Sequence, residues 1–583
     1  MSHLHSEPSR DAAESVESVE SVESVDVTIV GAGPVGLTLA NQLGLCGIRT
    51  LLVEAGDQLI DYPRGVGMDD ESLRAFQQIS LVDEIRRHTI PNQIMRFVNG
   101  SGTLLAELDP RTDEFGWPRR NGFIQPLVDA ELLKGARRFG TVEVRFGHRM
   151  EGFAERADGV DVDLTGPGGS PLTVRSRYLV GADGGRSQTR KLLGLPFEGR
   201  TEPSRWLVVD LRNDPLGSPN AYMGCDPSRP YVSIGLPHGI RRFEFMLRPE
   251  EDETFVEDDT QLHRMLAPLI PDPARADIIR RRAYTHSSRV AGTFRKGRIM
   301  VAGDAAHLMP VWQGQGFNSG IRDAVNLGWK LACVLHGGAS ERLLDSYDTE
   351  RRPHAAAMVD LSDKVGRVIS PTNRWLAGAR DAVLRGLGAV PAAKDYVTQM
   401  KFKPMPFYET GAVVHPTALA RNAAPCVGRL FIQPEVTTLD GAQPLLDEVI
   451  GPWFTVLAWN NNPLSLLDDE ARETWRRLGA RFVEARPMEQ LHWEGPIEQL
   501  DAEGLDVVGD HTGRLKAWFD RRPESFVVLR PDRFVAGAAL AQQASALTRR
   551  LAEALHLIPG GFDVPRPVLP VALTADGVRT PVV

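Results

Sequence analysis

One short segment near the start of the chain constrains its fold more than any other, Gly31-Ala-Gly-Pro-Val-Gly36. It follows the apolar run Val27–Val30 and precedes an amphipathic stretch from about Val35 to Cys46, after which comes a second apolar run, Thr50–Glu54. This pattern predicts a strand, a tight turn, a helix and another strand. Glycines at this spacing permit the turn, the approach of a pyrophosphate and close packing of helix on strand. We therefore expect dinucleotide binding, with a purely structural glycine turn as the alternative.

Glu54 stands at the end of the second predicted strand, about 20 residues beyond the glycines, where an acid accepts a hydrogen bond from a ribose hydroxyl. Pro34 is tolerated because its missing N–H lies in the first helical turn. The residues of this segment expected to contact the cofactor are Val30, Gly31, Ala32, Gly33, Pro34, Val35, Gly36, Glu54 and Ala55. The segment alone leaves both NAD and FAD open.

Two later segments favour FAD. Gly181-Ala-Asp183-Gly184 is followed by Ser187 and Arg190, and Gly303-Asp304-Ala-Ala-His307 follows another apolar run. An aspartate at a strand end suits a ribityl hydroxyl, and a glycine-rich run places backbone N–H groups near an electron-rich flavin edge. From the third segment we expect contacts from Ala302, Gly303, Asp304, Ala305, Ala306, His307, Pro310, Gly314, Gln315, Gly316 and Asn318.

Changes of pattern along the chain indicate an α/β protein with an α+β insert. A Rossmann-like FAD-binding domain is expected over residues 26–195 and again over 297–403, which include a helical stretch from about Glu350 to Lys401. Between them, residues 196–296 alternate in short runs typical of an antiparallel sheet, which we interpret as the substrate domain. Residues 404–583 form a third unit, in which we expect a helix over Ala538–Leu555 among others.

Composition excludes several classes of protein. The 583 residues carry a formal net charge of −9, which argues against nucleic acid as a partner. The four cysteines form no C-x-x-C pair, so neither a dithiol redox motif nor a zinc ribbon is expected, and no metal site is predicted. Without an apolar run of about 18 residues or a secretory signal, we expect a cytoplasmic protein that spans no membrane. The Glu-Ser-Val repeat within residues 1–25 predicts a disordered acidic tail, with a short helix as the alternative.

These motifs in this order resemble the FAD-dependent aromatic hydroxylases related to p-hydroxybenzoate hydroxylase and phenol hydroxylase. The resemblance implies that the first and third segments bind FAD and that Asp183 and Gly184 are linked to both FAD and nicotinamide. It also matches Arg64, in Tyr62-Pro-Arg-Gly, and Gln125, in Phe123-Ile-Gln-Pro, to residues that contact the flavin. For Arg64 a surface arginine is the alternative, and for His307 a structural hydrogen bond is favoured over proton transfer.

Within that family the chain resembles the 3-(3-hydroxyphenyl)propionate and 3-hydroxycinnamate hydroxylases from Asp26 to about Gly537. The resemblance rests on residues 303–330 and on Lys401-Phe-Lys-Pro-Met-Pro, Phe431-Ile-Gln-Pro and Leu529-Arg-Pro-Asp-Arg-Phe. It implies hydroxylation of a phenolic acid with O2 and NADH, a thioredoxin-like C-terminal domain without a dithiol, and it leaves a homodimer open. Because the chain has one G-x-G-x-x-G, the nicotinamide cofactor would lack a Rossmann domain of its own.

The chemistry is expected to come mainly from the flavin, and the protein must orient the ring, exclude water and deprotonate the phenol. The sequence identifies no base, so the catalytic residue stays unknown. Candidates for the base, each also explained by packing, are Tyr222, Tyr231, Tyr284 and His286. Trp312 and Phe317 are expected to face the pocket, with core packing as the alternative. An arginine suits the substrate carboxylate, and the candidates are Arg119, Arg120, Arg205 and Arg241. We expect hydroxylation ortho to the existing hydroxyl. A hydroxylase of another phenol or a polyketide, and more remotely a non-catalytic FAD-fold binding protein, are the alternatives.

Overall fold

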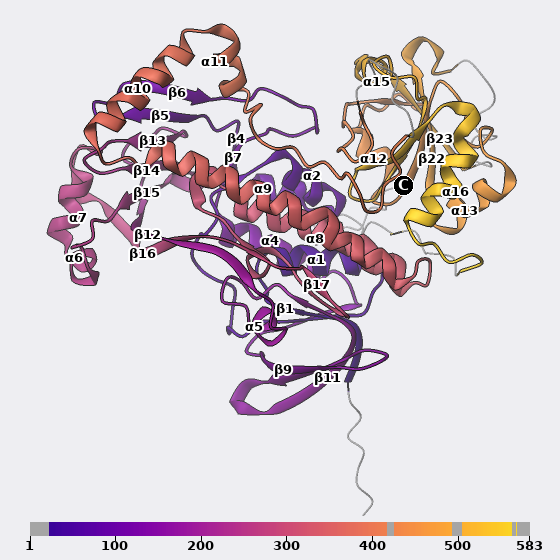
Figure 1. Cartoon of the computed structure of the whole chain (residues 1–583), viewed down its shortest axis with the longest axis horizontal. Coiled ribbons are helices and arrows are strands. Elements are labelled where there is room, and N and C mark those ends of the chain that lie inside the picture. The colour runs from indigo at the N-terminus through magenta and orange to yellow at the C-terminus, as the bar shows by residue number, and fades with distance from the viewer. Residues whose placement is uncertain (1–22, 417–424, 493–503, 562–566, 568–583) are drawn as a thin grey trace, which may run out of the picture.

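The computed structural model describes residues 23–416, 425–492, 504–561 and 567. Figure 1 shows a central body that carries the first strands and helices, a second sheet at one side, and a C-terminal unit at the other, joined along the long helix α9 (Asp345–Ile369). Among the described helices, none has both the length and the apolar character needed to cross a membrane.

The first sheet carries the glycine motif, and its main strands run in the order β17-β18-β11-β1-β2-β8. The bounds are β1 (Glu23–Val30), β2 (Thr50–Val53), β8 (Val142–Arg145), β11 (Pro171–Gly181), β17 (Arg295–Lys296) and β18 (Ile299–Val301), with β9 (Arg149–Glu155) and β10 (Val160–Thr165) antiparallel beside β11. Strands β8, β2, β1, β11 and β18 are parallel, as is typical of a doubly covered α/β sheet. Helix α1 (Pro34–Leu45) packs against α4 (Gln125–Ala136) and α8 (Gln315–Leu335). The predicted strand–turn–helix–strand opening is confirmed.

Strand β1 begins inside the predicted tail. Glu23, Ser24 and Val25 pair with the long strand β11, and the Glu23 carboxylate forms an ion pair of 2.6 Å with Arg145. Low-complexity residues are thus recruited into a strand because a partner strand and a counter-ion are already in place. The rest of the predicted tail lies outside the described residues.

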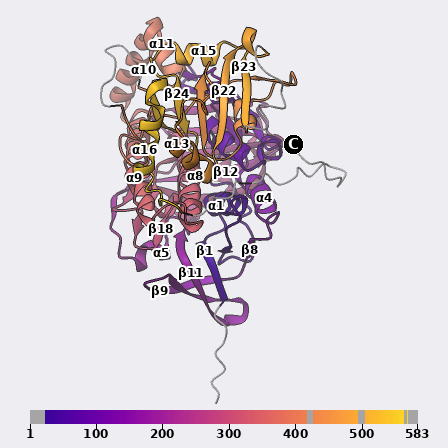
Figure 2. The same ribbon diagram turned by 90° about the vertical axis from the view of Figure 1, so that its right-hand side faces the viewer.

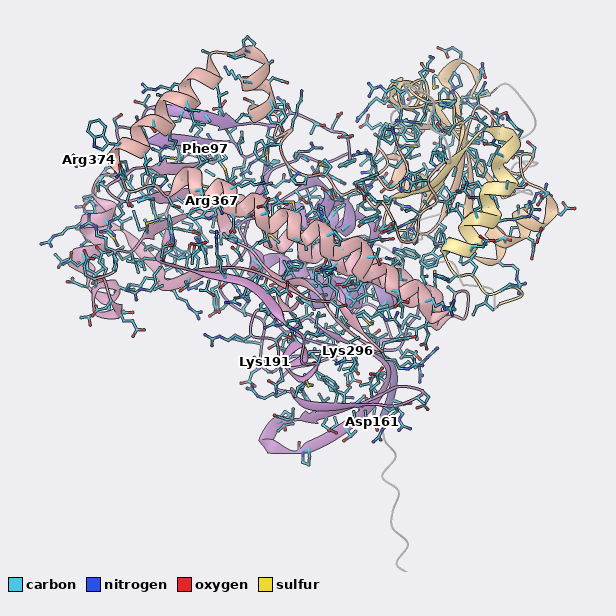
Figure 3. The ribbon with its side chains drawn as sticks, in the orientation of Figure 1. Phe97, Asp161, Lys191, Lys296, Arg367 and Arg374 are labelled. Atoms are coloured by element: carbon cyan, nitrogen blue, oxygen red, sulfur yellow. The ribbon has the colours of Figure 1, made fainter. Side chains whose placement is uncertain are left out.

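The second sheet runs in the order β19-β16-β12-β15-β14-β13-β5-β6. Its strands are β5 (Met95–Asn99), β6 (Leu104–Leu108), β12 (Phe197–Arg212), β13 (Ala221–Cys225), β14 (Tyr231–Leu236), β15 (Ile240–Met246), β16 (Asp277–Ala291) and β19 (His307–Leu308). The sheet therefore extends beyond the predicted range 196–296, because β5 pairs in parallel with β13. Parallel pairing joins segments far apart in the chain and leaves no local turn signal. Figure 3 labels Phe97 on this added pair of strands, next to α10 (Arg374–Gly388).

The two faces of the second sheet bury different side chains. Phe243 and Phe245 of β15 face outward and pack with α6 (Glu253–Glu257) and α7 (Asp259–Leu266). Met246, one residue further, belongs to another apolar cluster with Trp206, Tyr284 and Trp312, on the face toward the first domain. Successive residues of β15 therefore point to opposite faces of the sheet, one toward α6 and α7 and the other toward the first domain.

Helices connect the sheets. The predicted helical stretch appears as α9, α10 and α11 (Pro391–Thr398), and it begins at Asp345 rather than Glu350. Helices α10 and α11 cover β6, as Figure 1 shows at the upper left.

The C-terminal unit is a sheet of order β20-β23-β22-β21-β24-β25. Its strands are β20 (Thr437–Thr438), β21 (Thr455–Trp459), β22 (Arg481–Pro487), β23 (Leu505–Asp510), β24 (Phe526–Leu529) and β25 (Val535–Ala539), with helices α12 (Leu446–Ile450), α13 (Asp469–Arg477), α15 (Arg514–Phe519) and α16 (Ala544–Ala554). The unit faces the viewer in Figure 2. The predicted helix over Ala538–Leu555 starts too early, because Ala538 and Ala539 complete β25 against β24 and sheet pairing overrides their helix propensity. A thioredoxin-like fold stays a prediction.

Candidate functional site

The three glycines of the first motif have distinct surroundings. Gly31 has φ +109°, and a Cβ atom there would lie 2.4 Å from the Ala182 carbonyl oxygen. A Cβ at Gly36 would lie 2.0 Å from the Gly31 oxygen, so this glycine lets α1 approach the turn. A Cβ at Gly33, in contrast, would meet nothing within 4 Å. Gly33 therefore borders open space at the start of α1, where helix N–H groups favour phosphate.

Glu54 holds the motif from the neighbouring strand. Its two carboxylate oxygens accept hydrogen bonds of 2.9 Å from the backbone N–H groups of Ala32 and Gly56. The side chain stays half-buried at the end of β2, next to exposed Ala55. These two hydrogen bonds fix the orientation of the Glu54 carboxylate in the absence of a ligand.

The second and third motifs are tied together by Arg190. Asp183 accepts hydrogen bonds from Ser187 and Thr189 and so orders α5 (Gln188–Leu192), while Gly184 has φ +75°. Buried Arg190 then donates to the carbonyl oxygens of Gly185, at 2.9 Å, and Ala305, at 2.8 Å. The Asp183 carboxylate therefore has a structural role here.

Asp304 and Arg64, matched to flavin contacts from distant parts of the sequence, lie 3.2 Å apart. Their side chains are 36% and 55% exposed, so this ion pair contributes little to folding and leaves both groups available to a ligand. Next to Asp304, the Gly303 N–H donates to Asp323, and Val35 packs where a Gly303 side chain would stand.

Gln125 supports the Arg64 loop. Its Oε1 accepts hydrogen bonds from the backbone N–H groups of Arg64 (3.2 Å) and Gly65 (2.8 Å), and its Nε2 donates to buried Asp129. Burial raises the pKa of Asp129 to about 8. The Gln125 side-chain amide, which is predicted to contact the flavin, therefore binds the backbone of the loop that carries Arg64.

His307 is fully buried, and its Nε2 lies 2.7 Å from the Asp323 carboxylate, which also receives Arg351 at 2.9 Å. Burial raises the pKa of Asp323, but His307 and Arg351 lower it below its usual value. This arrangement supports a structural role for His307.

The N-terminus of α8 closes the third motif. Gly314 has φ +63°, and Asn318 donates to the carbonyl oxygens of Gly314 and Gly67 at 2.7 and 3.1 Å. The Asn318 oxygen accepts from Asp69 N–H and the Ser72 hydroxyl. Among the described side chains none caps α8, so its first N–H groups and positive dipole end face the loop from Pro310 to Gly314.

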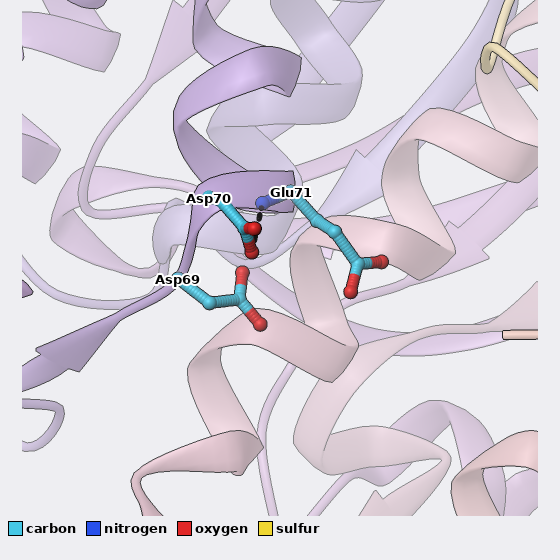
Figure 4. A group of neighbouring side chains, drawn as sticks. All are labelled: Asp69, Asp70 and Glu71. Carbon is cyan, nitrogen blue, oxygen red and sulfur yellow. Dashed lines mark hydrogen bonds between the residues drawn. The ribbon is translucent and has the colours of Figure 1, made fainter. Parts of the chain in front are cut away.

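Asp69, Asp70 and Glu71 form a compact group of acids at the start of α2 (Asp70–Gln78) (Figure 4). Arg322 pairs with Asp69 and Glu71, Lys403 lies 2.9 Å from Asp69, and Arg119 lies 3.1 Å from Asp70. Three cations thus balance three carboxylates. The group is explained as an ion-pair network without a metal.

On the inner face of the second sheet, two of the four candidate residues for proton transfer come together. The Tyr284 hydroxyl donates to Glu244 at 2.7 Å, and His286 Nε2 lies 3.1 Å from the same hydroxyl. His286 also packs against Trp206 and Trp312, and Trp312 belongs to the third motif. Tyr222 instead contacts Ser218, and Tyr231 packs with the outward cluster. Phe317 packs against Phe76 and Phe123.

The four candidate arginines differ in their partners. Arg119 pairs with Asp70 and Glu114, Arg205 donates to the Glu251 carbonyl, and Arg241 is occupied by Asp214 and Ser233. Arg120 donates to one backbone oxygen, that of Gln93, at 3.2 Å.

A buried ion network, which no sequence pattern predicted, lies between the FAD-binding part and the C-terminal unit. Glu350 receives Lys330 at 2.8 Å and Arg530 at 2.7 Å, and Asp447 receives Arg74 and Arg533. We call this network of buried ion pairs the seam. Two sequence motifs that resemble the hydroxylase subgroup contribute to it. Arg530 and Arg533 lie in the motif Leu529-Arg-Pro-Asp-Arg-Phe, and the backbone oxygen of Phe431, in Phe431-Ile-Gln-Pro, accepts a hydrogen bond from Arg74. A cavity of about 40 Å³ at the seam is far smaller than the several hundred Å³ of ordinary ligand pockets.

Comparison with known proteins agrees with this geometry. Residues 24–362 match the FAD binding domain family, and residues 428–554 match the HcaD C-terminal domain family. The 3-(3-hydroxy-phenyl)propionate/3-hydroxycinnamic acid hydroxylase of Mycobacterium sp. (strain KMS) is 59% identical over 94% of this chain and 95% of its own. The protein of the same description from Paraburkholderia xenovorans (strain LB400) is 49% identical, covering 92% of each chain.

Solved structures share the fold. The flavin-dependent monooxygenase PieE, in complex with FAD and substrate, aligns with a TM-score of 0.76 at 24% identity over 91% of this chain and 99% of its own. The p-nitrophenol 4-monooxygenase PnpA from Pseudomonas putida DLL-E4 aligns with a TM-score of 0.61 at 26% identity, over 65% of this chain and 98% of its own.

Proposed function

Because the chain belongs to the FAD-binding family of 3-(3-hydroxyphenyl)propionate/3-hydroxycinnamic acid hydroxylases, we propose that it hydroxylates these phenolic acids with O2 and NADH. The product is the 2,3-dihydroxy acid. The observation that carries the proposal is the convergence of three separate motifs at one edge of the first sheet, in a chain 59% identical to a hydroxylase of that description.

The residues at that edge fit FAD. Gly33 borders open space at the N-terminus of α1, and half-buried Glu54 stands at the neighbouring strand end. Asp304 presents an exposed carboxylate for a ribityl hydroxyl, and the uncapped N-terminus of α8 presents N–H groups for a flavin ring. When bound and reduced by NADH, the flavin would activate dioxygen, so that one oxygen atom of O2 enters the ring and the other leaves as water.

The protein's own task is to hold the phenol and exclude water. The inner face of the second sheet is apolar around the third motif, through Trp206, Ile234, Met246 and Trp312. Such a wall suits an aromatic ring and keeps water from the reaction.

We assign His286 as the group that accepts the phenol proton. The Tyr284 hydroxyl gives its one hydrogen to Glu244, so His286 Nε2 donates to the tyrosine oxygen and Nδ1 is left as the acceptor. That Nδ1 atom is buried and has no hydrogen-bond partner within the described part of the chain. Burial lowers the pKa of His286 to about 4, so the ring is neutral at physiological pH and its Nδ1 lone pair can accept a hydrogen bond from the phenol hydroxyl.

NADH is the proposed reductant. The chain has a single G-x-G-x-x-G, used for FAD, so the nicotinamide cofactor would bind transiently without a Rossmann domain of its own. The preference for NADH over NADPH rests on the relatives' subgroup.

The test is to follow both NADH oxidation and product with 3-(3-hydroxyphenyl)propionate, with simple phenols as controls. We expect 3-(2,3-dihydroxyphenyl)propionate, because a phenolate is electron-rich at its ortho and para carbons and orientation selects between them. The 2,5-dihydroxy product would mean that the ring is held the other way round. If only unrelated phenols are hydroxylated, the proposed substrate is wrong.

A further inference from the structure

Arg120 lies close to the expected flavin ring. It directly precedes β7 (Asn121–Phe123), which pairs with β3 (Gly67–Met68) in the register Gly67 to Gly122. Gly67 in turn lies against Gly314 at the start of α8. Since a strand advances about 3.3 Å per residue, Arg120 stands roughly 7 Å along β7 from Gly122, and Gly67 lies one strand spacing, about 5 Å, to the side.

The guanidinium of Arg120 lacks a counter-ion. It is half-buried and donates to the Gln93 carbonyl oxygen, and no carboxylate of the described chain lies within ion-pair distance. Burial lowers its pKa to about 10, whereas neighbouring Arg119, despite burial, has its pKa raised by Asp70. A buried charge without a partner is costly, so such a site suits an anionic ligand.

The surroundings of Arg120 lead to the apolar inner face of the second sheet. The Gln93 amide donates to the carbonyl oxygens of Pro219 and Gly235, at 2.7 Å each, and so fixes Gln93 against the end of β14. Ile234, the preceding residue of β14, belongs to the same apolar cluster as Val66 and Tyr284. Arg120 therefore lies beside the β14 end of that apolar cluster.

We infer that Arg120 binds the carboxylate of the phenolic acid and thereby selects acids over neutral phenols. This inference rests on the proposed function and deepens it. The planar guanidinium fork matches a carboxylate in two parallel hydrogen bonds. Arg119 and Arg241 are already paired with carboxylates. Arg205, like Arg120, donates to one backbone oxygen, but it alternates with Trp206 of the inner cluster and so lies on the outer face of the second sheet with Leu207.

The experiment compares 3-(3-hydroxyphenyl)propionate with 3-ethylphenol, which keeps the phenol and the first two side-chain carbons but lacks the carboxylate, in the wild type, Arg120→Met and Arg120→Lys. For Arg120→Met we expect kcat/KM for the acid to fall on the order of 10- to 100-fold, as for loss of a charge-assisted hydrogen bond, with little change for 3-ethylphenol. Arg120→Lys should recover part of the loss. Arg205→Met is the matched control and should leave the ratio of the two substrates unchanged.

Titration of the flavin absorbance with each compound gives a second readout, and the flavin spectrum itself reports whether each variant is folded. If the wild type makes the dihydroxy acid and both Arg120 variants keep its preference for the acid, Arg120 does not bind the carboxylate. The proposed function would still hold. A rise in KM for NADH in place of the acid would assign Arg120 to a nicotinamide phosphate and also overturn the anchor. If the wild type fails to hydroxylate the acid, the proposed function falls, and the anchor with it.

Discussion

Arg530 and Glu350 form a fully buried, two-pronged ion pair across 180 residues of sequence. The N–H groups of Arg530 donate to the two Glu350 oxygens at 2.7 and 2.8 Å, and Lys330 donates to the same carboxylate at 2.8 Å. The pair joins the C-terminal unit to α8 and α9 of the FAD-binding part. The C-terminal unit is therefore attached through buried ion pairs, and removing either partner of a pair would leave the other as an uncompensated buried charge.

Replacing Glu350 with Gln should destabilise the protein by about 3–5 kcal/mol, because Arg530 and Lys330 would keep buried, incompletely compensated charges. Denaturant unfolding measures this change, and Glu143→Gln, at an exposed ion pair, is the control that should change little. An equally small effect of both substitutions would contradict the role of the seam.

The same carboxylate gives a pH dependence. Burial raises the pKa of Glu350, but Arg530 and Lys330 lower it to about 2, from an ordinary value of 4.5. Because the folded pKa is lowered, the stabilisation is present above about pH 4.5 and is lost as the pH falls toward 2. Unfolding measured across that window should show a contribution in the wild type that Glu350→Gln lacks. Identical pH profiles of unfolding for the wild type and Glu350→Gln would show that Glu350 contributes no such pH dependence.

Replacing Asp304 with Ala should yield largely FAD-free protein. Its carboxylate is 36% exposed and its ion pair with Arg64 contributes little to folding, so the loss should appear in cofactor affinity and not in stability. The flavin-to-protein ratio after purification measures it. Asp161→Ala is the control, because Asp161 lies on the hairpin at the far end of the first sheet (Figure 3). Full retention of FAD in Asp304→Ala would show that the ribityl contact lies elsewhere.

Replacing His286 with Gln should lower kcat about 10²-fold or more, as is usual when a general base is removed, while FAD binding persists. In the wild type, with the pKa of His286 lowered to about 4, the base is available throughout the neutral range and is lost only as the pH falls toward 4. In the variant the rate should instead rise with pH as the phenol ionises by itself. His263→Gln, on the outer helix α7, should behave as the wild type. A variant with an unchanged pH profile would exclude His286 as the base.

A chain that starts at Glu23 should keep its FAD and its turnover, because the Glu-Ser-Val repeat before it has no core-forming pattern. A chain that starts at Asp26 should melt a few degrees lower, since it loses three residues of β1 pairing and the ion pair of Glu23 with Arg145. Thermal melting of both chains decides this. Loss of FAD from the longer chain would show that the removed residues pack on the body.

Local patterns predicted the elements that local interactions build. The first motif follows from the spacing of its glycines and apolar runs, and its strand, turn, helix and second strand form as expected. The helix predicted to start at Ala538 starts later for a non-local reason. Alanine favours a helix, but Ala538 and Ala539 pair with strand β24 and are therefore part of a strand. The transfer of β5 into the second sheet likewise depends on a partner more than 100 residues away.

The sequence by itself determined the order of motifs, and with it the cofactor and the family of this protein. It also narrowed the candidates for the base and the carboxylate anchor to a few residue types. Only the tertiary structure distinguishes these candidates by their surroundings. It pairs Arg119 and Arg241 with carboxylates, leaves Arg120 without a counter-ion among the described residues, and sets His286 beside Tyr284 and Glu244. The physical reason is that a spacing of glycines acts through a few consecutive residues, whereas the state of a charged side chain depends on which partner the fold brings within a few ångströms of it.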